Sequence, residues 1–180
     1  MMYPNNNKGL GCFVYSDFAV GCSTKKSDDP ASVYSHTGYI IKYKNCPILW
    51  ASKLQSEIFL STTEAEYIAL SQAMIEIIPM MEHLEQLEKT LNIESKRPRV
   101  ICKVFEDING VIELAKAPKI CPCTKQIALK YHHFKEHVRK GLIGINLIGT
   151  IEQVADIFTI AFPFPIFNYL RKKMMDWSKQ

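Results

Sequence analysis

The sequence of 180 residues lacks any apolar run of about 18 or more residues, the length that a membrane-spanning helix needs. It also begins with polar residues rather than the basic and apolar regions of a signal peptide. No internal repeat is present, and no low-complexity segment beyond the asparagines at 5–7. We therefore expect an intracellular protein, cytoplasmic or nuclear, that has no membrane partner.

Cysteines at the spacing of a metal site or a disulfide framework are equally scarce. The six cysteines are scattered through a chain that is too large for a disulfide-dominated scaffold. Only Cys121 and Cys123 lie close together, and no matching cysteine or histidine pair stands at zinc-finger distance. We expect free thiols, and a zinc site made by these two cysteines with His132 and His133 is the alternative.

The composition is that of one ordinary globular domain. Hydrophobic residues make up 47% of the chain, enough to bury a single core, and charged residues make up 22%. The net charge of +4 permits a nucleic-acid partner without requiring one. We expect a domain over residues 9–160, with a polar N-terminal extension at 1–8 and a C-terminal helical tail at 161–180.

Apolar patterning and turn residues predict a mixture of strands and helices. Strands are expected at 10–15, 37–43, 47–52, 100–105 and 142–148, with a turn at Lys44 and Asn45 and a loop at 21–35. Helices are expected at 61–91, 109–116, 124–140, 152–159 and 167–177, and Pro79 is expected to kink or split the first. This order predicts an α/β fold with a mixed sheet and helices on its faces.

Two carboxylates stand near the start of the long predicted helix. Ser61 followed by Glu64 matches a capping box, in which side chains bind the free backbone N–H groups of the first turn. Glu66 lies further in, where no cap requires an acid. It is either a solvated acid favoured by the helix dipole or a residue with a separate task.

Acidic residues recur at the ends of predicted strands and in predicted helices. They are Asp17, Glu66, Glu106, Asp107 and Asp156. Carboxylates that converge at strand ends bind hard cations such as Mg²⁺, and two such ions about 4 Å apart promote phosphodiester cleavage. The alternative is coincidence, because a chain with 18 acidic residues places a few of them at strand ends in any case.

Several segments resemble one known family. The residues at 61–70 resemble the S-T-E-A-E-Y-x-A-L signature in the ribonuclease H domain of copia-type LTR retrotransposons. Five further segments resemble other motifs of the family, in order. Residues 37–39 resemble T-G-Y, 47–55 resemble P-I-x-W-x-S-K-x-Q, 106–110 resemble E-D-N-N-G with isoleucine in place of the first asparagine, 124–132 resemble T-K-H-I-x-x-x-Y-H, and 153–159 resemble Q-x-A-D-x-x-T. The resemblance covers roughly residues 8–177 and has the character of a degenerate copy.

The resemblance implies an RNase H-like fold, in which a five-stranded mixed sheet combines an antiparallel three-strand meander with parallel strands. It implies a hydrolase, an endonuclease that cuts the RNA strand of an RNA:DNA hybrid with two Mg²⁺ ions or with Mn²⁺ in their place. It also implies a position after the reverse transcriptase domain of a Pol polyprotein. By motif, the second, third and fourth metal-binding carboxylates are Glu66, Asp107 and Asp156.

The first metal-binding carboxylate is open between two alignments. Without gaps, Tyr15 occupies the ligand position and Asp17 matches a second, non-ligand aspartate, whereas a two-residue shift makes Asp17 the ligand. We favour the ungapped alignment. Residues 15 and 17 of a strand lie about 6.6 Å apart, too far for Asp17 to supply an oxygen about 2.1 Å from Mg²⁺. Because Tyr15 also removes a negative charge, we predict weak metal affinity and very low activity.

Basic residues gather in and near the predicted helix at 124–140. Lys125, Lys130 and Lys135 are candidates to contact nucleic acid, and so is His132, which matches the family's Y-H pair. The alternatives are a solvated helix face for the lysines and a packing or hydrogen-bonding role for His132.

Other departures from the family pattern remove basic residues. Gln126 replaces a histidine, Ile160 replaces a lysine, and Cys121 and Cys123 stand where related sequences carry arginine. Such losses weaken phosphate contacts. We rank an impaired ribonuclease H domain that still binds hybrid first and an active enzyme that uses Asp17 second. A non-catalytic nucleic-acid-binding or interaction module is the third reading.

Overall fold

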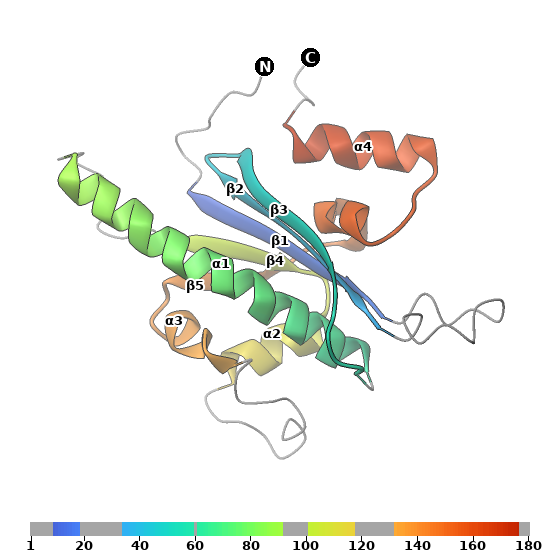
Figure 1. The fold of residues 1–180 in the computed structure, drawn as a ribbon, viewed down its shortest axis with the longest axis horizontal. Coiled ribbons are helices and arrows are strands. Elements are labelled where there is room, and N and C mark those ends of the chain that lie inside the picture. Colours follow the sequence, from blue (N-terminus) through green and yellow to red (C-terminus); the bar gives the residue numbers. More distant parts are fainter. Residues whose placement is uncertain (1–8, 19–33, 60, 92–100, 118–131, 177–180) are drawn as a thin grey trace.

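The computed structural model describes residues 9–18, 34–59, 61–91, 101–117 and 132–176 (Figure 1). Within these ranges the chain forms one five-stranded sheet in the order β3-β2-β1-β4-β5. β1 (Leu10–Asp17), β2 (His36–Tyr43) and β3 (Cys46–Leu54) form an antiparallel meander. β4 (Cys102–Glu106) runs parallel to β1, and β5 (Ile143–Leu147) runs parallel to β4. The expected α/β fold with a mixed five-stranded sheet is confirmed.

Helices cover both faces of this sheet. α1 (Thr62–Thr90), α2 (Asn109–Lys116) and α3 (Lys135–Arg139) lie on one side. After β5 come two short 3₁₀ helices, η4 (Thr150–Glu152) and η5 (Val154–Phe158), and then α4 (Phe164–Met174). η5 and α4 pack on the opposite side, away from α1 (Figure 1). No helix in the described part of the chain is both long and apolar enough to cross a bilayer.

The β1 side chains alternate between two hydrophobic cores because successive residues of a strand face opposite sides. Leu10, Cys12 and Val14 are buried in the core beneath α1. On the other face, Phe13 packs against a smaller core that contains Ile40 of β2 and Leu170 of α4. The sheet is therefore held from both sides. The turn between β2 and β3 falls at Lys44 and Asn45, as predicted, and both have positive φ angles, 49° and 74°, which suit a two-residue hairpin.

α1 starts where the capping pattern predicted and continues through Pro79. The Ser61 hydroxyl caps the helix by accepting a hydrogen bond from the Glu64 N–H at 3.2 Å. The predicted split at Pro79 is wrong, because α1 is continuous to Thr90. Proline leaves the carbonyl of Ile75 without its helical partner. Both residues are exposed on the outer side of the helix, so water can bind that carbonyl.

The helices predicted at 124–140 and 152–159 differ from those observed. Residues 124–131 lie outside the described residues, and the described remainder is α-helical only at Lys135–Arg139. Phe134 is fully buried and its ring lies beside that of Tyr67, so the chain turns there before the helix begins. Over 152–159, two 3₁₀ helices are separated by Gln153, whose backbone is extended (φ −75°, ψ 95°).

The last helix also begins earlier than its predicted start at 167. Pro163 precedes α4 and Pro165 lies in its first turn, where proline's fixed φ angle and missing N–H suit a helix start. Trp177 and the rest of the predicted C-terminal end lie outside the described residues, as does most of the predicted loop at 21–35.

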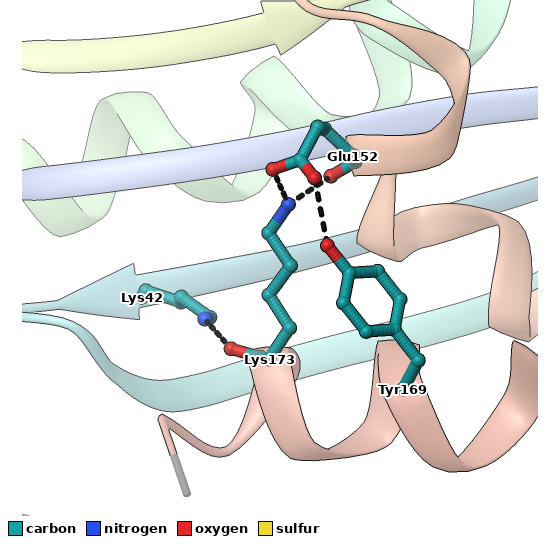
Figure 2. A network of polar contacts seen from close by, with 4 residues as sticks. All are labelled: Lys42, Glu152, Tyr169 and Lys173. Atoms are coloured by element: carbon teal, nitrogen blue, oxygen red, sulfur yellow. Dashed lines mark hydrogen bonds and ion pairs between the residues drawn. The ribbon is translucent and has the colours of Figure 1, made fainter. Parts of the chain in front are cut away.

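Polar contacts attach α4 to the segments around it, as Figure 2 shows. The Lys173 ammonium forms an ion pair with the carboxylate of Glu152 in η4. The Tyr169 hydroxyl donates a hydrogen bond to the same carboxylate at 2.8 Å. On the other side, the Lys42 ammonium of β2 donates to the Lys173 carbonyl oxygen at 3.1 Å. These contacts connect α4 both to the sheet and to the 3₁₀ segment that precedes Asp156.

Candidate metal and nucleic-acid site

The site lies where β1 and β4 part. β4 pairs with β1 from Leu10 to Phe13, whereas β1 itself continues to Asp17. Beyond Phe13, backbone groups of β1 that a longer β4 would pair with form hydrogen bonds to side chains instead. The Val14 carbonyl accepts a hydrogen bond from Gln153 Nε2 at 2.8 Å, and the Ser16 N–H donates to Glu66 Oε2 at 2.7 Å. The gap between the strands is thus closed by side chains from α1 and the 3₁₀ segment.

Four carboxylates gather at this gap. They belong to Glu66 of α1, Glu106 at the end of β4, Asp107 directly after it, and Asp156 of η5. One oxygen each from Glu66, Glu106 and Asp107 lies within 4.8 Å of the other two. Asp156 is close enough for its charge to raise the pKa values of Glu66 and Glu106. The structure therefore brings together three acids that the sequence motifs singled out and adds Glu106.

Glu106 is the functional candidate that motif matching passed over. The E-D pair was noted at a strand end, but the motif assigned metal binding to Asp107 alone. Strand alternation would have found it, because Cys102, Val104 and Glu106 occupy every second position of β4 and all three are buried. The first two belong to the core beneath α1, and Glu106 follows them on the same face.

Burial and mutual repulsion raise the pKa values of these acids. Burial raises the pKa of Glu66 to about 10, with a further rise from Glu106, and the Ser16 N–H opposes the rise. Burial raises the pKa of Asp156 to about 7, and Asp107 adds to this rise. The pKa of Glu106 lies well above its usual range because of burial first and the Asp107 charge second.

No lysine or arginine among the described residues forms an ion pair with any of the four acids. A group of buried carboxylates cannot all be ionised at neutral pH unless a positive charge compensates them. With no such charge among the described residues, the raised pKa values favour the protonated acids, and a divalent cation would compete with those protons.

Tyr15 lies among these carboxylates. It pairs with Gly38 across the β1–β2 ladder, so the two residues share a face of the sheet. A Cβ atom added to Gly38 would lie 2.9 Å from the Ala155 carbonyl oxygen, which shows that this face contacts η5. Burial raises the pKa of the Tyr15 hydroxyl, and the charges of Asp156 and Glu66 raise it further. A neutral phenol thus stands where the ungapped alignment places the first metal ligand.

Asp17 lies two residues further along β1 and has a contact of its own. It is buried at the end of the strand, and its Oδ1 accepts a hydrogen bond from the His36 N–H at 3.0 Å. This bond closes the end of the β1–β2 ladder. In the described part of the chain, the oxygens that lie within 4.8 Å of one another come from Glu66, Glu106 and Asp107, not from Asp17. Metal binding by Asp17 stays a prediction.

Gln55 connects the elements that carry the site. It is 2% exposed, and its Nε2 lies 2.9 Å from the Ala65 carbonyl oxygen and 2.9 Å from Thr37 Oγ1. The same nitrogen lies 3.2 Å from Ser16 Oγ. These contacts fix the first turn of α1 against β1 and β2. Because Glu66 directly follows Ala65, Gln55 also fixes the position of the Glu66 backbone.

Two of the four residues predicted to contact nucleic acid, Lys125 and Lys130, lie outside the described residues. His132 Nδ1 lies 2.6 Å from the hydroxyl of Tyr67, the α1 residue that follows Glu66. This contact agrees with the hydrogen-bonding alternative for His132. Lys135 begins α3, and its ammonium lies 3.5 Å from the Ala117 carbonyl oxygen. Nucleic-acid contact stays a prediction for all four residues.

The described cysteines Cys12, Cys46 and Cys102 are free thiols. Burial raises the pKa of Cys102 to about 12, so this thiol stays protonated at neutral pH. The remaining cysteines, including the two of the alternative zinc site, lie outside the described residues.

No family model matches the sequence, but curated transposon proteins do. The chain is 35% identical over 129 residues to the retrovirus-related Pol polyprotein from transposon TNT 1-94 of Nicotiana tabacum, a match that covers 72% of the chain and 9% of that protein. It is 32% and 31% identical to the corresponding polyproteins from transposons RE1 and RE2 of Arabidopsis thaliana, over 131 and 145 residues. These matches cover 73% and 80% of the chain, and 8% and 10% of the two polyproteins. The chain spans a tenth or less of the length of each of these relatives.

Solved structures of LC11-RNase H1, isolated from compost by a metagenomic approach, are also similar. One covers 84% of this chain and 92% of its own, with 15% sequence identity and a TM-score of 0.48. The other, a complex of LC11-RNase H1 with an RNA/DNA hybrid, covers 83% of this chain and 93% of its own, with 13% identity and the same TM-score.

Proposed function

Since this chain belongs to the family of retrovirus-related Pol polyproteins of transposons, we propose that it is a copia-type ribonuclease H domain whose hydrolytic activity is impaired. The observation that carries the proposal is the neutral side chain of Tyr15 among the carboxylates. The proposed substrate is the RNA strand of an RNA:DNA hybrid. The proposed partner is the reverse transcriptase domain upstream in the same polyprotein.

The residues of the site fit a divalent cation. One oxygen of Asp107 and one of Asp156 are buried without a hydrogen bond from the described residues, and so are both oxygens of Glu106. Carboxylate oxygens are the ligands that Mg²⁺ and Mn²⁺ prefer. Glu66, Asp107 and Asp156 would hold the metal, which when bound would polarise the phosphodiester and lower the pKa of a water molecule.

The chain itself holds these carboxylates in place. The Ser16 N–H fixes one oxygen of Glu66, and Gln55 holds the turn of α1 that carries Glu66. The side chain of Gln153 is completely buried and bonds to the Val14 carbonyl, which anchors the 3₁₀ segment of Asp156 against β1. Ligands that are held before a cation arrives need less reorganisation when it binds.

Tyr15 weakens such a site in two ways. Its hydroxyl is neutral at neutral pH, so it contributes no negative charge to attract a cation. Its ring is also larger than an aspartate side chain, so it leaves less room for metal and substrate beside the carboxylates. Both effects reduce the stabilisation of charge that develops on the phosphodiester in the transition state.

The test is cleavage of a labelled RNA:DNA hybrid in Mg²⁺ and in Mn²⁺ by the natural sequence, Tyr15→Asp and Tyr15→Phe. We expect Tyr15→Asp to raise the cleavage rate at least about tenfold, equivalent to about 1.4 kcal/mol of transition-state stabilisation. Tyr15→Phe is the matched control, since it removes the hydroxyl but adds no charge, and it should stay as slow as the natural sequence. Equal rates in all three proteins would contradict the proposal.

A second candidate is an active enzyme whose first ligand is Asp17. It is favoured by the burial of Asp17 at the end of β1, on the same face of the strand as Tyr15. In that case the natural sequence would cleave hybrid rapidly, and Asp17→Asn would abolish the activity. Slow cleavage that Asp17→Asn leaves unchanged would exclude this candidate. Hybrid binding without cleavage in any variant, including Tyr15→Asp, would indicate a purely non-catalytic nucleic-acid-binding module.

A further inference from the structure

Glu106 is a buried acid that the proposed function does not use. It is 0% exposed, and it ends the run of inward-facing β4 residues whose earlier members, Cys102 and Val104, belong to the core beneath α1. An ordinary core position at the end of such a run carries an apolar side chain. A carboxylate there is costly, because an ionised group loses its hydration when it is buried.

The polar groups of the described residues compensate this cost only in part. Neither oxygen of Glu106 makes a hydrogen bond of ordinary length and angle to a described residue. The N–H groups of Asp107 and Ile108 lower the pKa of Glu106, but burial and the Asp107 charge outweigh them. The charges that act on Glu106 are those of Asp107 and Asp156, both carboxylates, and no lysine or arginine within the described ranges forms an ion pair with it.

The carboxylate of Glu106 is directed at two other acids. One of its oxygens lies within 4.8 Å of oxygens of both Glu66 and Asp107. Two ligands of one Mg²⁺ ion lie at most about 4.2 Å apart, twice the Mg–O distance of about 2.1 Å. At least two of the three oxygen pairs must be neighbouring ligands of the octahedral ion, about 3.0 Å apart. The oxygens therefore need to approach by up to about 1.8 Å to bind one ion, a movement that side-chain rotation supplies.

We propose that Glu106 is a metal ligand and that it holds one divalent cation together with Glu66 and Asp107. The inference rests on the proposed function and deepens it. The three carboxylates together provide the negative charge for cation binding that Tyr15 does not provide. The chain therefore retains one cation although its hydrolytic activity is impaired. The ligands are all hard oxygen donors, which favours Mg²⁺ and Mn²⁺ over metals that prefer sulfur or imidazole.

Titration with Mn²⁺, followed by the electron paramagnetic resonance signal of the free ion, tests this proposal on the full chain. The natural sequence should bind Mn²⁺, and Glu106→Gln should raise the dissociation constant at least tenfold, a change of about 1.4 kcal/mol. The matched control is Glu113→Gln, which removes an exposed acid from α2 and should leave Mn²⁺ affinity unchanged. Equal affinities of Glu106→Gln and the natural sequence would overturn the proposal, and so would absence of Mn²⁺ binding by the natural sequence.

A loss of Mn²⁺ binding that is caused by misfolding must be distinguished from one that is caused by removal of a metal ligand. Glutamine has the shape of glutamate and no charge, so metal-free Glu106→Gln should melt at the same temperature as the natural sequence or higher. Mn²⁺ should then raise the melting temperature of the natural sequence but not that of Glu106→Gln. A rise of equal size in both proteins would overturn the role of Glu106.

Further variants separate this proposal from the proposed function. If Glu66→Gln and Asp107→Asn lose Mn²⁺ while Glu106→Gln keeps it, the role of Glu106 fails and the ribonuclease H assignment stands. If Tyr15→Asp neither binds Mn²⁺ nor cleaves hybrid, the proposed function fails as well. If Glu106→Gln loses Mn²⁺ while the natural sequence binds it, the role of Glu106 stands whatever the cleavage rates are.

Discussion

The two ends of the parallel strands differ in what their residues do. At the N-terminal ends, Leu10, Cys102 and Ile143 are buried together in the core beneath α1. At the C-terminal ends, β1 and β4 finish in Asp17 and Glu106, and the strands separate around carboxylates that form no ion pair with a lysine or arginine in the described part of the chain. The same strands therefore stabilise the fold at one end and hold closely spaced, buried acids at the other. Apolar burial at the first end offsets the cost of the second.

The largest effect should come from placing a charge in the stabilising half. Val104 is completely buried in the core beneath α1, so Val104→Asp should destabilise the protein by about 4 kcal/mol or more, through an unpaired buried carboxylate. Ile101 is 46% exposed just before β4, so Ile101→Asp is the matched control, with an expected change within about 0.5 kcal/mol. Urea denaturation followed by circular dichroism measures both. Similar losses for the two variants would show that this end is not the main source of stability.

A smaller effect is expected where the charged half contacts η5. A Cβ atom at Gly38 would meet the Thr159 methyl group at 2.8 Å and the Ala155 carbonyl oxygen at 2.9 Å. Gly38→Ala should therefore displace η5 and cost about 1–3 kcal/mol, the usual range for overpacking. Gly149→Ala is the control, because a Cβ there meets nothing within 4 Å. The free energy of unfolding in urea is measured for both variants and the natural sequence. An unchanged value for Gly38→Ala would mean that η5 is not held tightly against β2.

The most gradual effect concerns pH, because it is spread over several pH units. The pKa of Asp156 is raised from 3.8 to about 7 in the folded protein, and that of Glu66 from 4.5 to about 10. Both acids therefore bind protons more tightly when folded. The stability that they contribute is complete below about pH 4 and is lost as the pH rises through their folded values, by at most about 1.4 kcal/mol per pH unit for each proton.

This loss should be visible as a fall in the free energy of unfolding of the metal-free protein between about pH 5 and 8. Asp156→Asn should flatten the slope in that range, whereas Glu82→Gln, which alters an exposed acid on α1, should leave it as it was. Urea titrations in the presence of EDTA give the slopes. A slope that Asp156→Asn does not change would show that Asp156 titrates normally.

Much of the fold follows from local patterns in the sequence. The β2–β3 turn follows from Lys44 and Asn45, the start of α1 from Ser61, and the limits of α2 (Asn109–Lys116) from its apolar spacing. The errors arise where tertiary contacts override local preference. Pro79 is tolerated within α1 because it faces solvent. Gln153 interrupts the predicted helix at 152–159 because its side chain donates a hydrogen bond to the Val14 carbonyl.

The site was less accessible to sequence reasoning than the fold. The motifs pointed to Glu66, Asp107 and Asp156, and these residues do lie at one gap in the sheet. A motif carries no information about hydrogen bonds or burial, so neither the Asp17 contact to His36 nor the complete burial of Glu106 could be predicted from it. Strand alternation could have indicated Glu106, but only once β4 was known to end at that residue.

The contacts of Glu152 determine what a truncation of the gene would do to the region around Asp156. This residue joins α4 to η4, the 3₁₀ helix just before the one that carries Asp156, through its bonds to Lys173 and Tyr169. A premature stop codon after Thr159 would leave every codon for a candidate metal ligand intact. The truncated product would still lose one of the two anchors of the Asp156 segment, together with Leu170 from the core against Ile40. The reading frame must therefore stay open well beyond the codon of Asp156 for the Asp156 side chain to be held in place.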